Sequence, residues 1–252
     1  TYVGSIEQET SDTAVFHEGH IRNVKATWNP GLLHIFDEVL NNAVENHIRK
    51  KGTTHIKVTL TDTTMTVRND GTSIPLTTLE GEYLPTVLFG MLRSGSNFDD
   101  TSGRQTGGKN GLGVKLCNIF STQFTVTVVH NKQKFKQSWS SNMATRGKVS
   151  LTKCKSADSV TVSFTPDLQR FGCRTIDATM QGILTKRCLD VVFCYPALKI
   201  SINGQQYCKT PLQYLKCLST AAPVISQTPH WTVAVFPNLD SETDGQQLSF
   251  VN

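Results

Sequence analysis

The chain has 252 residues, of which 38% are hydrophobic and 18% are charged, and its formal net charge is +5 at pH 7. These values are typical of a globular protein with a full-sized core, and they argue against disorder. No apolar run approaches the roughly 20 residues that a membrane span requires. The lysines and arginines are mostly scattered, so the charge favours solvated faces over a nucleic-acid footprint, although contact with DNA phosphates is permitted.

The cysteines also limit the class of protein. Their number, seven, is odd, and no two of them show Cys-x-x-Cys spacing. No signal peptide is visible at the start of the chain. The sequence therefore predicts reduced thiols of an intracellular protein rather than a disulfide framework or a zinc site.

A helix over residues 30–51 is the strongest predicted element, and it follows short extended pieces and turns at 1–29. Apolar residues recur at spacings of three and four, with Asn29 before a proline as the start signal and Gly52 as the stop signal. Four polar residues fall together on this helix, and two of them, Asn42 and Asn46, interrupt the edge of its apolar stripe: Glu38, Asn42, Glu45 and Asn46. Such groups need partners, so the helix borders either a ligand cavity or a packed loop. We assign Asn46 a plain structural hydrogen bond.

The remaining elements separate into strands and helices. Alternation predicts an antiparallel hairpin from 54–60 and 65–68 that ends at Asn69-Asp70-Gly71. Further helices are predicted in the second half of 75–91, at 114–120 and at 175–190. Strands of a meandering sheet are predicted at 124–130, 134–139, 148–153 and 159–164, followed by a strand at 198–202, a turn at 203–204, a return at 205–208, a linker at 221–229 and a hairpin of 231–236 with 247–251.

This segregation predicts an α+β fold in which helices and one sheet form a two-layer α/β sandwich. We expect one domain over 1–220, and a linker with the first hairpin of a second, truncated domain over 221–252. Thr1 is not an initiator methionine, and Asn252 follows an apolar run. We therefore expect a fragment of a longer protein.

A glycine-rich segment precedes the helix at 114–120. Four glycines lie within the seven residues 107–113, so successive backbone amides could converge on a phosphate, and Lys115 could neutralise its charge. A flexible surface loop is the alternative reading of the same segment.

The common phosphate-binding motifs do not fit this segment. Gly103 to Lys109 has Walker spacing, but Asn110 stands where Ser or Thr would ligate magnesium. The dinucleotide fingerprint fails because Leu116 stands where Gly or Ala is required. The chain also lacks the His-Arg-Asp and Asp-Phe-Gly motifs of protein kinases.

The order of the polar motifs resembles that of the Bergerat-type (GHKL) ATPase superfamily of gyrases, heat-shock chaperones, histidine kinases and mismatch-repair ATPases. Within it, the sequence resembles most the eukaryotic-type DNA topoisomerases II. The resemblance covers nearly the whole chain and rests on these segments: Thr-Tyr-Val-Gly-Ser, Ile-Phe-Asp-Glu-Val-Leu-Asn-Asn-Ala, Ser-Gly-Ser-Asn-Phe-Asp-Asp, Thr-Gly-Gly-Lys-Asn-Gly-Leu-Gly-Val-Lys-Leu-Cys-Asn-Ile-Phe-Ser and Leu-Ser-Phe-Val-Asn.

The resemblance implies a role for each matching residue. Glu38 would be the general base that activates water, and Asn42 would ligate a single magnesium ion. Asp70 would accept a hydrogen bond from the adenine amino group, within the cofactor-binding motif Asn69-Asp70-Gly71. The ribose and phosphates would be contacted by Ser96 and Asn97, and the triphosphate would be wrapped by Gly108, Lys109, Asn110, Gly111, Leu112, Gly113, Val114 and Lys115.

Two residues depart from the family pattern. Ser73 replaces a glycine of the adenine-side loop, and Gly95 stands where relatives often have serine. The family's activating lysine would lie beyond Asn252, in the transducer domain, and the N-terminal arm exchanged between protomers would precede Thr1. We therefore expect the fragment to bind ATP better than it hydrolyses it.

The implied function is that of the ATP-binding and hydrolysing region of a type II DNA topoisomerase. ATP and magnesium would be its cofactors, and the full-length protein would be a nuclear, or mitochondrial, homodimer that binds duplex DNA mainly through other regions, with no membrane contact. Two alternatives stay open. One is another Bergerat-type ATPase, such as a chaperone or a mismatch-repair clamp, and the other is a nucleotide-gated interaction module without significant turnover.

Overall fold

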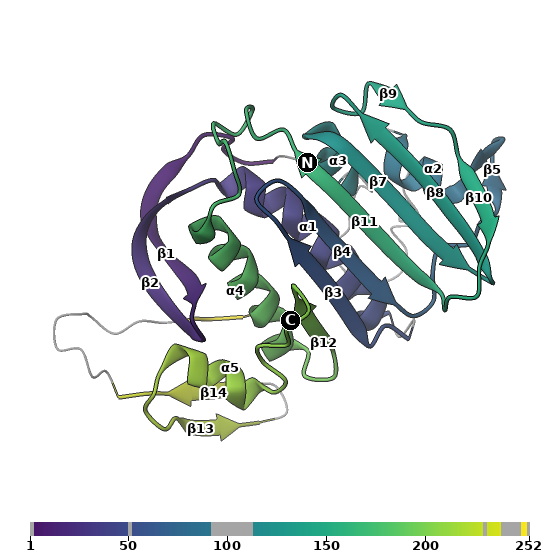
Figure 1. Cartoon of the computed structure of the whole chain (residues 1–252). Helices are drawn as coiled ribbons and strands as arrows, with labels where there is room; N and C mark the ends of the chain where they lie inside the picture. Colours follow the sequence, from purple (N-terminus) through teal and green to yellow (C-terminus); the bar gives the residue numbers. More distant parts are fainter. Residues whose placement is uncertain (1–2, 50–51, 92–112, 229–230, 238–247, 251–252) are drawn as a thin grey trace, which may run out of the picture.

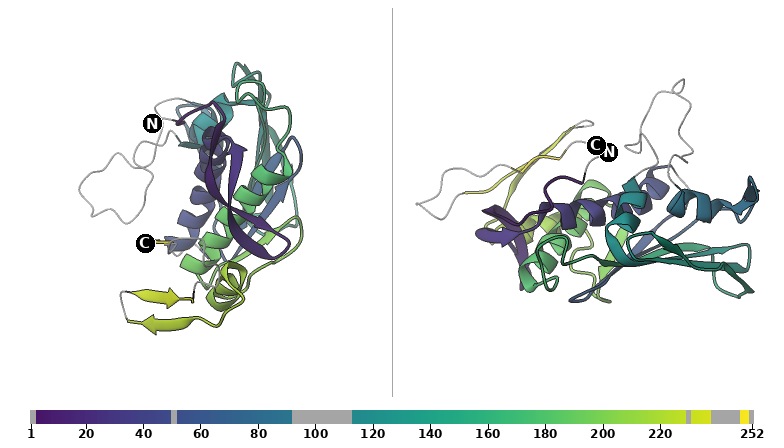
Figure 2. Two further views of the ribbon diagram at one scale, coloured as in Figure 1. Left: turned by 90° about the vertical axis from the view of Figure 1, so that its left-hand side faces the viewer. Right: turned by 90° about the horizontal axis from the view of Figure 1, so that it is seen from above.

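The computed structural model describes residues 3–49, 52–91, 113–228, 231–237 and 248–250. One sheet of eight strands dominates this part of the chain. In Figure 1, α1 (Pro30–Ile48), α2 (Leu84–Gly90) and α3 (Gly113–Ile119) lie behind the strands, whereas α4 (Ala178–Cys194) lies beside the sheet. Figure 2 shows the same arrangement from two further sides. Within the described residues, no helix has the length and apolar character needed to cross a membrane. The predicted two-layer α+β architecture is confirmed.

The strand order of the sheet is β10-β8-β7-β11-β4-β3-β12, with β9 paired to β8. The predicted simple meander is wrong, because β11 crosses back and lies between β7 and β4. All pairs are antiparallel except that of β12 with β3. The strands are β3 (His55–Leu60), β4 (Met65–Asp70), β7 (Ser121–His130), β8 (Gln133–Ser140), β9 (Thr145–Arg146), β10 (Ser150–Lys153), β11 (Ser159–Pro166) and β12 (Lys199–Ile202).

Helix α1 (Pro30–Ile48) supplies the centre of the core. The Asn29 side chain accepts a hydrogen bond from the backbone N–H of Leu32 at 3.0 Å and caps its first turn. The apolar stripe, including Ile35, Phe36 and Leu40, is fully buried. It packs against the face of the sheet that carries the buried residues of β3 and β4, so the opposite face of the sheet is left to solvent.

The other helices extend this layer. α3 (Gly113–Ile119) lies beside α1 over β7 and β11, and α2 (Leu84–Gly90) lies beside α3 over β7. α4 (Ala178–Cys194) lies between α1 and the N-terminal strands. Asp177 caps α4 through the N–H of Met180, so α4 begins three residues after the predicted start. The sequence patterns did not predict α5 (Pro211–Leu218) or the two-residue strands β5 (Thr78–Leu79) and β6 (Glu82–Tyr83).

Both ends of the chain differ from the prediction. Residues 1–29 contain two nine-residue strands, β1 (Glu9–His17) and β2 (His20–Trp28), which form a hairpin packed on α4. The predicted return strand at 205–208 is only an isolated bridge between Ile202 and Gln205. Near the C-terminus, β14 (Thr232–Val235) pairs with β13 (Val224–Gln227), inside the predicted linker, and not with residues 248–250, the described part of the predicted partner strand. The domain boundary at 220 stays a prediction.

An ion pair joins α1 to α4. Arg187 Nε lies 2.7 Å from Asp37 Oδ1, and its Nη2 donates to Asn41 Oδ1 at 3.1 Å. Burial raises the pKa of Asp37, while the nearby Arg187 guanidinium opposes that rise. Asp37, next to Glu38 in sequence, therefore serves the helix packing.

We expect Arg187→Met to lower the free energy of unfolding at pH 7 by about 1–3 kcal/mol, because it leaves the Asp37 carboxylate buried without its cation. Loss of the guanidinium should raise the pKa of Asp37 further. A group whose folded-state pKa is raised loses stability as pH rises through that pKa, so the deficit should shrink as pH falls towards the usual carboxylate range. Urea denaturation across this pH range measures the effect.

The matched control is the double variant Asp37→Asn with Arg187→Met, which removes both charges. It should recover most of the stability at pH 7 and lose the pH dependence. If Arg187→Met lowers the free energy of unfolding by the same amount at every pH, the assigned ion pair is wrong.

Candidate functional site

Glu38 lies where α1 meets the start of α3. Its carboxylate rests against the α-carbon of Gly113, and a β-carbon built on Gly113 would overlap Glu38 Oε2. The Glu38 side chain keeps 28% of its surface exposed. Only glycine at position 113 lets this carboxylate lie beside the end of the glycine-rich segment. The structure thus brings together two predicted site residues that are far apart in the sequence.

His34 lies beside Glu38 and was not among the residues predicted from the sequence. Its Nε2 lies 3.4 Å from Glu38 Oε1, one helical turn away. This nitrogen is buried and makes no hydrogen bond within the described part of the chain. An imidazole so placed can orient the carboxylate and polarise it. The i, i+4 spacing of the two residues was the available signal.

The two asparagines of α1 differ in their surroundings. Asn42, one turn beyond Glu38, is exposed, and its amide makes no hydrogen bond to a described residue. Asn46 donates to Thr53 Oγ1 at 2.8 Å and to the carbonyl of Thr72 at 3.0 Å. The structural role predicted for Asn46 is confirmed, and Asn42 retains an available side-chain oxygen.

Asn69 and Asp70, at the end of β4, point to opposite faces of the sheet. Asn69 is 6% exposed and pairs with Ile56, a buried residue on the face that α1 covers. Asp70 points to the open face, where it accepts hydrogen bonds from the backbone N–H groups of Thr54 (2.8 Å) and His55 (2.9 Å). Burial alone would raise the pKa of Asp70, but these hydrogen bonds and that of the Thr54 hydroxyl outweigh burial and lower it.

This arrangement argues against the role that the resemblance implied for Asp70. Its oxygens already have partners, and they lie across the sheet from Glu38. Asn69 is the residue of the pair on the helix face. The physical reason is strand alternation, since neighbouring residues of a strand point to opposite sides.

The loop after β4 is fixed in spite of its departure from the family pattern. Gly71 has φ of +91°, a conformation that favours glycine. Ser73 is buried, and its hydroxyl lies 3.0 Å from His130 Nδ1 and 3.3 Å from Asp158 Oδ2. Because serine and aspartate share one ring nitrogen, this group does not have the relay geometry of a catalytic triad. It ties the loop to the end of β7 and to the residue before β11.

At the start of α3, Val114 and Lys115 are buried. Burial lowers the pKa of Lys115. The remaining predicted site residues lie outside the described residues: Ser96, Asn97, Gly108, Lys109, Asn110, Gly111 and Leu112. Their roles stay predictions.

Sequence comparison identifies the family. Residues 29–170 match the family of histidine kinase-, DNA gyrase B- and HSP90-like ATPases. The DNA topoisomerase 2 of Pisum sativum is 34% identical over 273 residues, which cover 100% of this chain and 18% of the relative. The DNA topoisomerase 2-alpha of Gallus gallus is 37% identical over 273 residues, which cover 100% of this chain and 17% of the relative. The chain therefore spans less than a fifth of the length of these relatives.

Solved structures agree with the sequence relatives. The ATPase region of Saccharomyces cerevisiae topoisomerase II superposes with a TM-score of 0.86 at 32% identity, covering 93% of this chain and 66% of that one. The ATPase and transducer domains of DNA topoisomerase II from Balamuthia mandrillaris superpose with a TM-score of 0.87 at 33% sequence identity, covering 95% of this chain and 65% of that one. The gyrase B ATPase domain of Thermus thermophilus superposes with a TM-score of 0.56 at 22% sequence identity, covering 70% of this chain and 44% of that one, and it shares the fold. The chain thus belongs to the histidine kinase-, DNA gyrase B- and HSP90-like ATPase family, and within that family it is homologous to the ATPase region of type II DNA topoisomerases.

Proposed function

We propose that this chain binds ATP with magnesium between α1, the end of β4 and the start of α3, and that Glu38 is the base for hydrolysis. The contact of Glu38 with Gly113 carries the proposal. Gly113 ends the glycine-rich sequence that the resemblance assigns to the triphosphate. A terminal phosphate held there would lie beside a carboxylate that can take a proton from the attacking water.

We propose that His34 positions Glu38. Its Nε2 faces Glu38 Oε1 and has no competing hydrogen bond among the described residues. A carboxylate held in one orientation spends more of its time in the geometry that accepts the proton of water.

The surroundings of Asn42 suit the role of a magnesium ligand. Its side-chain oxygen is exposed one turn from Glu38, without another partner in the described chain, and hard cations prefer oxygen ligands. When bound there with ATP, magnesium would neutralise charge on the phosphates. We propose that Asn69, on the helix face, contacts the adenine in place of Asp70.

The wider role is proposed from the relatives, which are named DNA topoisomerases 2 and are far longer than this chain. ATP would drive dimerisation of a gate through which one DNA duplex passes another. The longer protein would be a homodimer and would bind duplex DNA mainly through other regions.

We expect Glu38→Gln to reduce ATP turnover by about 10²- to 10⁴-fold while the Kd for magnesium-ATP changes little, because the amide fills the same space but cannot accept the proton. Steady-state kinetics and calorimetry measure the two effects, in this chain and in the full-length protein. Glu45→Gln is the control, since Glu45 lies on the same helix but pairs with Arg49 at 3.2 Å. Unchanged turnover in Glu38→Gln would mean that Glu38 is not the base.

His34→Leu should lower kcat about tenfold, which corresponds to about 1.4 kcal/mol, with little effect on the KM for ATP. The reason is that His34 reaches the carboxylate and not the nucleotide. If KM rises while kcat is unchanged, His34 acts on ATP binding instead.

Asn69→Ala and Asp70→Asn should have different effects. We expect Asn69→Ala to weaken ATP binding about tenfold, through the loss of an adenine contact. Asp70→Asn should lower the free energy of unfolding by about 1 kcal/mol at pH 7 and leave ATP affinity unchanged. Because the pKa of Asp70 is lowered in the folded state, this stability difference should disappear as pH falls through that pKa. The reverse pattern in calorimetry would restore Asp70 as the adenine-binding residue.

A further inference from the structure

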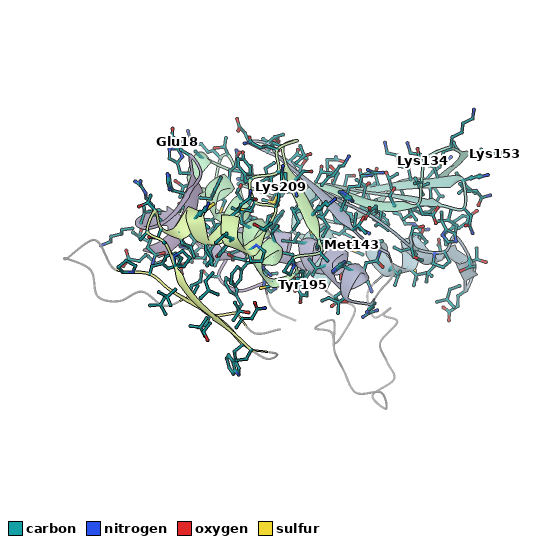
Figure 3. All side chains as sticks on the ribbon, turned by 90° about the horizontal axis from the view of Figure 1, so that it is seen from below. Glu18, Lys134, Met143, Lys153, Tyr195 and Lys209 are labelled. Atoms are coloured by element: carbon teal, nitrogen blue, oxygen red, sulfur yellow. The ribbon has the colours of Figure 1, made fainter. Side chains whose placement is uncertain are left out.

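The face of the eight-stranded sheet opposite α1 is open to solvent. Figure 1 shows this face towards the viewer, with α1, α2 and α3 behind the strands. Figure 3 shows it along the upper side of the sheet, where Lys134 is labelled. The alternation of exposed and buried residues in β3 assigns each side chain to one face: His55, Lys57 and Thr59 are exposed, whereas the residues between them are buried.

The strand registers align cations on this face. Lys57 pairs with Arg68, and Lys136 lies three strands further along the same cross-strand row. Lys134 and Lys199 lie on an adjacent row. The complete first row contains Ser201, Lys57, Arg68, Thr161, Thr127, Lys136 and Ser150.

The charge of this face is positive and largely uncompensated. None of the five cations (Lys57, Arg68, Lys134, Lys136 and Lys199) forms an ion pair with a described residue. The eight strands contain one carboxylate, Asp70, which the Thr54 and His55 donors already hold. The face therefore presents charge that a polyanion can neutralise.

The residues between the cations favour a phosphate backbone over a protein surface. They are mostly serine and threonine, including the hydroxyl pairs Thr66 with Ser163 and Thr125 with Ser138, each at 2.8 Å. Lysine, arginine and hydroxyl side chains are the usual donors to nucleic-acid phosphates. A protein partner needs apolar or aromatic anchors, and the described strands expose no large hydrophobic side chain on this face.

We propose that this face binds the phosphate backbone of duplex DNA without reading its sequence. The cross-strand row spans seven strands, about 29 Å at about 4.8 Å per strand, which matches eight to nine base pairs at about 3.4 Å each. Five phosphate contacts predict a slope of log K against log salt of about −4.5. The proposal goes beyond the ATPase function and does not depend on the nucleotide site.

The test measures binding of the chain to a fluorescein-labelled duplex of about 20 base pairs by anisotropy, without nucleotide, between about 50 and 200 mM salt. The unsubstituted chain should lose about 500-fold in affinity over this range. The triple variant Lys57→Gln, Arg68→Gln, Lys136→Gln should bind the duplex more weakly at low salt. Its affinity should fall only about 12-fold over the same salt range, since two phosphate contacts remain.

The control triple variant is Arg22→Gln, Lys25→Gln, Arg174→Gln. It removes the same number of exposed cations outside the sheet face. Its affinity for the duplex and the salt dependence of that affinity should match those of the unsubstituted chain. Circular dichroism establishes that both variants fold. Magnesium-ATP titration is recorded separately, so a failure there bears on the nucleotide site and not on this face.

Three results would overturn the proposal. Equal weakening in both triple variants would mean that net charge alone attracts DNA. Absence of DNA binding by the unsubstituted chain at about 50 mM salt would rule out this face as a DNA-binding surface. Tighter binding of poly-glutamate than of duplex DNA, lost in the sheet-face variant, would assign the face to an acidic protein.

Discussion

The burial of one stripe of α1 against the sheet is the constraint on which the rest of the structure depends. Ile35, Phe36 and Leu40 are fully buried, which fixes both the rotation and the height of the helix. Once the apolar stripe is fixed, the polar edge of the helix cannot turn elsewhere. Glu38 is then held against Gly113, with His34 one turn before it. The geometry of the proposed catalytic residue is thus a consequence of core packing on the other side of the same helix.

Alternation along the strands separates two surfaces with different chemistry. Residues facing α1 line the core and the proposed nucleotide site, whereas their immediate neighbours face solvent. Asn69 and Asp70 show how sharp this separation is, because one step along β4 moves a side chain from the helix face to the open face. The basic row on the open face follows from the same rule, since Lys57 and Arg68 alternate with buried residues.

A hydrogen-bond network fixes the loop that follows β4. Asn46 on α1 reaches Thr53 and the carbonyl of Thr72, and the Thr53 hydroxyl donates to the Asp70 carbonyl at 2.6 Å. Ser73 adds a contact to His130 and Asp158 from the other side. A serine in place of the family's glycine costs backbone freedom, but here its hydroxyl gains two half-buried partners, His130 and Asp158. The departure from the family pattern therefore leaves the loop anchored.

Elements with local signals could be predicted from the amino-acid sequence. The cap at Asn29, the apolar spacing of α1 and the alternation of β3 and β4 each depend on neighbouring residues. Helical spacing also grouped Glu38 and Asn42 on the polar edge of α1, and the resemblance added a role for each of them. Three features became evident only in the folded chain: β11 lies between β7 and β4, β12 runs parallel to β3, and Gly113 contacts Glu38. These are pairings of distant segments, which no local pattern encodes, because burial and hydrogen bonding across the whole fold select them.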